Sequence, residues 1–167
     1  MERHGSYLDA LSGELGLIES LIDLAHQKRR AILDSDTDRI DGITSLEETR
    51  LDDVLNLRNR RRDMLLEILG EGPGNRPSVA PGGQRRYRLL ATAPDYLRPK
   101  LSATIDRYDA NLMALRRETQ INNTLLADRL RVMGRTLEWI QTSVIEKESY
   151  ERRKKTGGLP VLVNQVV

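Results

Sequence analysis

Residues 115–126 read Leu-Arg-Arg-Glu-Thr-Gln-Ile-Asn-Asn-Thr-Leu-Leu, and they lie in the middle of the segment that decides the fold. In this segment one set of positions recurs at alternating steps of three and four residues: Leu101, Ile105, Tyr108, Leu112, Leu115, Thr119, Asn122, Leu126, Arg129, Met133, Leu137, Ile140 and Val144. Such spacing is typical of one face of a long helix that packs against a partner helix. Thr119 and Asn122 interrupt that apolar face. The segment therefore predicts a long helix with a polar break, which either fixes the register of paired helices or leaves the face available to a ligand helix.

Two earlier segments, residues 7–33 and 37–69, carry apolar residues at the same helical spacing and predict two helices. Ser6 is expected to cap the first helix and Asp36 the second, because their side-chain oxygens can accept hydrogen bonds from the first turn. Gly70 is expected to end the second helix. The connection between the two helices is short, so they should be antiparallel neighbours.

The remaining segments differ in composition. Residues 70–83 are rich in Gly and Pro and predict a flexible linker. Residues 85–90 are undecided, and residues 92–98 predict a short helical turn capped by Thr92, after which the long helix should run from about residue 99 to 155. Residues 156–167 are expected to be flexible, and the alternative is that their apolar part, residues 159–167, binds the protein's own groove when no ligand occupies it.

The fold class predicted from these segments is all-α. We expect an antiparallel helical hairpin plus one long C-terminal helix, forming an elongated three-helix bundle or coiled coil within a single domain, residues 1–155. Phe is absent and aromatic residues make up only 4% of the chain, so Leu, Ile, Val and Met must fill the core, as they do in helical bundles.

The composition argues against several classes of function. The chain has no Cys, its two His residues lack metal-ligand spacing, and its glycine-rich segment precedes no phosphate-binding Lys-Ser or Lys-Thr pair. We therefore expect no catalytic residues, no metal and no cofactor. Nucleic acid is not an expected partner either, because the net charge is only +2 and acidic residues accompany the basic runs. No apolar run is long enough for a signal peptide or a membrane span, so we expect a cytoplasmic protein.

Two stretches resemble the FlgN family of flagellar type III export chaperones. The first stretch, residues 31–65, contains a leucine-rich helix end, a short acidic turn and a second helix with arginines near its end. The second, residues 115–140, contains Gln120, Asn122 and Asn123 before the leucine pair at 125 and 126. The resemblance covers about two-thirds of the chain in matching order, and it departs from the family at the Gly/Pro linker and the apolar tail.

This resemblance implies a non-enzymatic helical chaperone that binds the C-terminal helical regions of hook-associated proteins and delivers them to the export gate. Its substrate-binding groove would be lined by Leu115, Asn122, Leu126, Met133 and Leu137. In the family, the end of the chain contributes to docking at the cytoplasmic domain of the export-gate membrane protein, which makes Tyr150 a candidate docking residue. The free protein would be a monomer or a weak homodimer. The alternative is a coiled-coil scaffold protein that self-associates through the same face.

Overall fold

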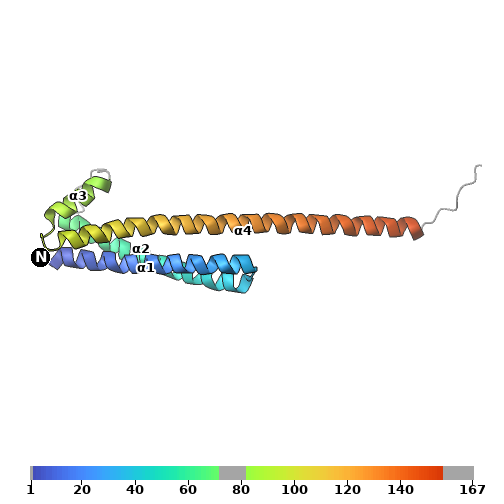
Figure 1. The fold of residues 1–167 in the computed structure, drawn as a ribbon, viewed down its shortest axis with the longest axis horizontal. Helices are drawn as coiled ribbons and strands as arrows, with labels where there is room; N and C mark the ends of the chain where they lie inside the picture. Colours follow the sequence, from blue (N-terminus) through green and yellow to red (C-terminus); the bar gives the residue numbers. More distant parts are fainter. Residues whose placement is uncertain (1, 72–81, 156–167) are drawn as a thin grey trace, which may run out of the picture. The chain divides into compact units, whose positions relative to one another are not determined.

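The computed structural model describes residues 2–71 and 82–155, and the side chains of residues 3–71 and 84–147 (Figure 1). Within these ranges no strand occurs, so the prediction of an all-α chain is confirmed. The helices are α1 (Glu2–Asp34), α2 (Thr37–Leu69), α3 (Gly82–Thr92) and α4 (Arg98–Lys155). The chain forms two compact units, Met1–Leu125 and Leu126–Val167, and α4 contributes to both.

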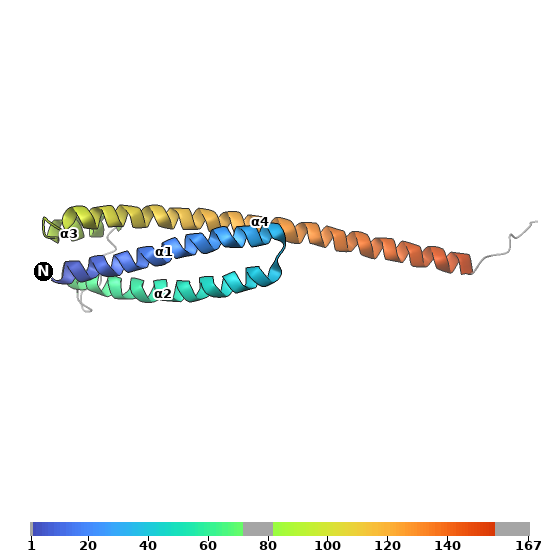
Figure 2. The same ribbon diagram turned by 60° about the horizontal axis from the view of Figure 1, so that its bottom comes forward.

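Helices α1 and α2 lie side by side and run in opposite directions (Figures 1 and 2). Near the turn that joins them, Lys28 Nζ lies 2.7 Å from Glu47 Oε2, and towards the other end Arg61 Nε lies 2.7 Å from Glu14 Oε2. The turn begins at Ser35, whose φ of 58° is left-handed. These pairs show that the short connection brings the two helices together along most of their length.

The ends of α2 follow the signals in the sequence. The Oδ1 atom of Asp36 accepts a hydrogen bond of 3.0 Å from the backbone N–H of Arg39, so the prediction that Asp36 caps the second helix is confirmed. At the other end Gly70 has a φ of 69°, a conformation that costs glycine little. Its N–H donates to Glu67, and the N–H of Glu71 donates back to Leu66 over 2.8 Å. This arrangement satisfies carbonyls that the end of a helix would otherwise leave open.

Three local predictions are wrong. Helix α1 already begins at Glu2, so Ser6 lies inside the helix and does not cap it. Thr92 does not cap a new helix: its hydroxyl donates to the carbonyls of Arg88 and Leu89, at 3.0 and 3.1 Å, in the last turn of α3. The third error concerns the linker predicted over residues 70–83, because α3 begins at Gly82 within it. The same helix includes residues 85–90, which the sequence left undecided. The predictions for residues 72–81 and 156–167 lie outside the described residues.

The core of the unit Met1–Leu125 consists of two apolar clusters. The larger cluster joins α1 to α3 and α4, and its buried members are Tyr7, Leu8, Leu11, Leu15, Ile18, Leu89, Ala93, Leu101 and Tyr108. The smaller cluster joins α1 to α2 through Leu21, Leu24, Ala31 and Ile43. Leu115 of α4 is partly buried against both clusters. Burying a leucine or isoleucine contributes about 1.5–3 kcal/mol, so these clusters hold the helices of this unit together.

A buried polar junction also connects three helices of this unit. Glu14 of α1 has an exposed fraction of 0%, and its carboxylate accepts hydrogen bonds from Arg61 of α2 and from the hydroxyl of Tyr108 of α4. Arg61 also donates to the hydroxyl of Tyr7 over 3.1 Å, and its guanidinium carbon lies 5.0 Å from the centre of the Tyr108 ring. Burial and the hydrogen bond to Glu14 raise the pKa of Tyr108 to about 12. Burial alone would lower the pKa of Arg61, but its hydrogen bond to Glu14 and the nearby charges raise it above the ordinary value.

Candidate functional site

The stripe of three-four spacing on α4 has two parts with different surroundings. In the unit Met1–Leu125 the stripe residues Leu101 and Tyr108 are buried in the core. In the unit Leu126–Val167, Leu126 is half-buried and the later apolar positions are exposed. The five residues predicted to line the groove are therefore divided: Leu115 and Asn122 lie in the first unit, and Leu126, Met133 and Leu137 in the second.

Asn122 contacts the backbone of α1. Its side chain is buried, and Nδ2 donates a 2.7 Å hydrogen bond to the carbonyl oxygen of Ala25. One turn earlier, Glu118 forms an ion pair with Arg29 of α1 and lies 3.4 Å from Nε2 of His26. The hydroxyl of Thr119 instead donates to the carbonyl of Leu115 on its own helix. Of the two residues of the polar break, only Asn122 thus joins α4 to α1, and the neighbouring Glu118 adds a second connection.

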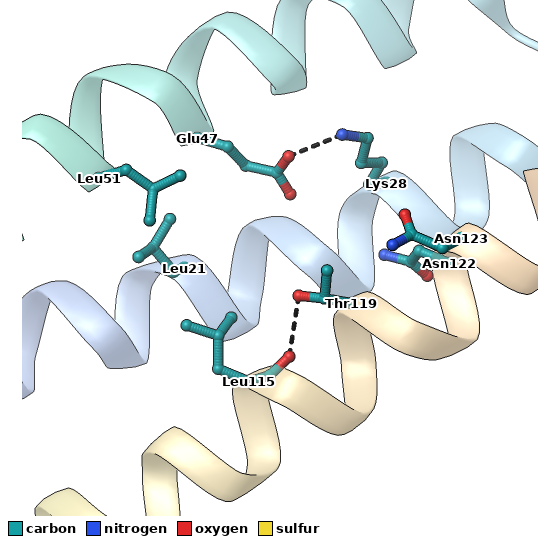
Figure 3. A pocket seen from close by; sticks show the side chains of 8 residues that line it. All are labelled: Leu21, Lys28, Glu47, Leu51, Leu115, Thr119, Asn122 and Asn123. Carbon is teal, nitrogen blue, oxygen red and sulfur yellow. Dashed lines mark hydrogen bonds and ion pairs between the residues drawn. The ribbon is translucent and has the colours of Figure 1, made fainter.

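A pocket of about 130 Å³ lies beside this contact (Figure 3). Residues of three helices line it: Leu21 and Lys28 of α1, Glu47 and Leu51 of α2, and Leu115, Thr119, Asn122 and Asn123 of α4. Its apolar wall consists of the three leucines, and the ion pair between Lys28 and Glu47 lies at its edge. The pocket has about the size of a cavity that holds one small apolar group.

Asn122→Leu is expected to raise the free energy of unfolding by about 1 kcal/mol. Among the described residues, Oδ1 of Asn122 has no hydrogen-bond partner, and a buried acceptor of this kind costs about 1–3 kcal/mol. Leucine removes that cost. The substitution also removes the hydrogen bond to Ala25, but a neutral hydrogen bond of this kind contributes only about 1 kcal/mol. Urea denaturation of both proteins measures the difference. A stability below that of the wild type would show that the hydrogen bond to Ala25 outweighs the unpaired oxygen.

The C-terminal part of the stripe is an exposed apolar face. It comprises four positions of that stripe and the neighbouring Leu130, and we call these five residues the α4 stripe: Leu130, Met133, Leu137, Ile140 and Val144. Their exposed fractions range from 45 to 68%. At 1.5 Å per residue the α4 stripe extends for about 21 Å. Contiguous exposed apolar surface on a protein usually marks an interaction site, so we assign the α4 stripe as the candidate binding face.

Two further apolar residues, Val132 and Trp139, are also exposed on this part of α4. Successive residues of a helix are turned by about 100°, which places both on a different side of the helix from the α4 stripe. Tyr150 lies on α4 as well, but its side chain is outside the described residues.

A metal site and a membrane span each require features that the described residues lack. Within residues 3–71 and 84–147, no three His, Asp or Glu residues are arranged to hold a metal ion. None of the described helices combines the length and the apolar character that crossing a membrane requires.

An all-α fold with exposed apolar residues at helical spacing on its last helix is typical of proteins that bind an amphipathic helix. A family profile described as "FlgN protein" matches residues 4–158. The chain therefore belongs to the FlgN family, as the sequence resemblance predicted, and FlgN is a family of flagellar export chaperones. No curated protein and no solved structure matches the chain.

Proposed function

We propose that this protein binds the C-terminal helical region of hook-associated proteins on the α4 stripe. The α4 stripe is the observation that carries the proposal, because its apolar residues recur at the spacing with which one helix contacts another. An amphipathic helix of an unassembled subunit exposes an apolar face that would otherwise self-associate. Burying that face against α4 keeps the subunit soluble in the cytoplasm and prevents premature assembly.

Met133 and Leu137 are the central client contacts in this proposal, and Leu126 lies one helical turn before the α4 stripe begins. Leu115 and Asn122 belong to the pocket of Figure 3, which would accept one apolar side chain of the client. The buried amide of Asn122 also holds α4 against α1. Its role in client binding would therefore be to shape the pocket wall.

Delivery to the type III export gate is the second half of the proposed function. Tyr150 would contact the cytoplasmic domain of the export-gate membrane protein, since it follows the α4 stripe on the same helix. A site separate from the α4 stripe would let the gate recognise the chaperone while the client is still bound.

Isothermal titration of the full chain with C-terminal helical fragments of hook-associated proteins from the same cell tests client binding. We expect saturable binding with a negative heat-capacity change, because apolar surface is buried. A fragment whose apolar positions are replaced by Ser is the matched control and should bind at least tenfold more weakly. Absence of binding to every such fragment would refute the proposal.

Self-association through the α4 stripe is the competing function, since the same face can pair with a second copy. Sedimentation of the free protein distinguishes the two. We expect a monomer or a weak homodimer that dissociates when a client fragment is added. A stable homo-oligomer that the fragment leaves unchanged would instead support a coiled-coil scaffold.

A further inference from the structure

The apolar residues 159–167 follow α4 in the same unit as the α4 stripe. We propose that this segment, the tail, binds back onto the C-terminal part of the α4 stripe around Leu137, Ile140 and Val144. The tail would then compete with a client helix for this surface. The contact between the tail and α4 does not depend on the proposed function. Only the competition with a client helix rests on the proposed function.

The composition of the tail matches the surface it would cover. It reads Leu-Pro-Val-Leu-Val-Asn-Gln-Val-Val, so six of its nine residues are Leu or Val and none is charged. The preceding residues 151–155, Glu-Arg-Arg-Lys-Lys, are all charged. Removing apolar surface from water contributes about 25 cal/mol per Å², and the exposed residues of the α4 stripe provide such surface next to the tail in the sequence.

The length of the tail sets which residues it can reach. Gly157 and Gly158 separate it from the end of α4 at Lys155, and glycine permits the backbone conformations that a reversal of the chain requires. Nine extended residues then span about 30 Å. Along the helix, Val144 lies about 17 Å and Leu137 about 27 Å before Lys155. Residues 159–167 can therefore cover the α4 stripe as far as Leu137, while their nine residues do not span the distance of about 33 Å to Met133.

A weak contact is sufficient for an effect on client binding. A short linker gives its attached segment an effective concentration in the millimolar range. A tail that binds with a dissociation constant of about 0.1 mM would therefore cover the stripe most of the time and weaken client binding about tenfold. A client that buries a longer part of the stripe, including Met133, would still displace it.

Disulfide formation in the full chain tests the contact, because the natural chain contains no cysteine. In the test variant, Val144→Cys and Val163→Cys place one thiol on the α4 stripe and one in the tail. In the control, Thr142→Cys and Val163→Cys place the helix thiol on the opposite side of α4, at another exposed position. With oxidised glutathione as the oxidant, we expect the intramolecular disulfide of the test variant to form at least tenfold faster in dilute protein. Equal rates would refute the contact, and circular dichroism verifies that both variants remain helical.

The competition is tested by introducing charge into the tail of the full chain. Leu162→Asp with Val163→Asp should tighten the binding of a hook-associated fragment about tenfold, because the charged tail no longer covers the stripe. Asn164→Asp with Gln165→Glu adds the same charge without removing an apolar residue and should change the affinity less than twofold. Fast disulfide formation with unchanged client affinity would refute the competition. Failure of every variant to bind a client would refute the proposed function, while the disulfide rates would still decide whether the tail contacts α4.

Discussion

Glu14→Leu is expected to lower the free energy of unfolding by about 3–5 kcal/mol, the cost of breaking a buried ion pair on one side. The Glu14 side chain is completely buried, and the side chain of Arg61 is only 17% exposed. The substitution leaves the guanidinium without its carboxylate and removes the acceptor for the hydroxyl of Tyr108. Three helices meet at this point, so the loss should appear in the cooperative unfolding transition. Urea denaturation followed by far-UV circular dichroism measures it.

Two controls separate the ion pair from a general effect of substitution in α1. Glu19→Ala removes a more exposed carboxylate, which lies 2.7 Å from Arg107, and should cost no more than about 1 kcal/mol. The double variant Glu14→Leu with Arg61→Leu should recover most of the loss, because replacing a whole buried ion pair by apolar residues is often neutral. If Glu14→Leu costs no more than Glu19→Ala, the junction does not stabilise the helices.

Leu137→Asp is expected to weaken the binding of a hook-associated C-terminal fragment about hundredfold. Leu137 lies at the centre of the α4 stripe, where truncating a central contact typically costs 2 kcal/mol or more, and a carboxylate adds the cost of desolvating a charge. The side chain is 58% exposed in the free protein, so the free energy of unfolding should change by less than about 0.5 kcal/mol. Titration calorimetry and urea denaturation on the same preparation measure both quantities.

Trp139→Asp is the matched control for this prediction. Trp139 lies two residues further along α4, is also apolar, and is 70% exposed on another side of the helix. Its substitution should change the affinity for the fragment less than threefold. Equal losses for Leu137→Asp and Trp139→Asp would show that binding does not depend on the α4 stripe and would remove the main support for the proposed client site.

Local signals allowed several features to be predicted from the sequence. The cap at Asp36 and the left-handed Gly70 depend on hydrogen bonds between residues at most five positions apart, so the sequence contains their whole cause. Helix α3 was not recognised because it is short and begins with two glycines. Its Leu89 is buried against residues of α1 that lie far away in the sequence, and only tertiary packing supplies that contribution.

The junction of Glu14 with Arg61 could not be predicted for the same reason. The two residues are separated by 47 positions, and the run of arginines around Arg61 gives no sign of which one is buried. The only available signal was that Glu14 follows the apolar Leu11 at helical spacing, on the face of α1 that enters the core.

The sequence by itself determined that the chain is helical, where α2 begins and ends, and that one stripe runs along α4, because each of these depends on spacing within a few turns. The spacing is the same at Leu101 and at Leu137, so it could not tell a buried position from an exposed one. Tertiary structure decided this difference. Helix α4 has 58 residues, and only its first part belongs to the unit that also contains α1, α2 and α3. Leu101 is buried among them, and Leu137 remains exposed as part of the candidate binding face.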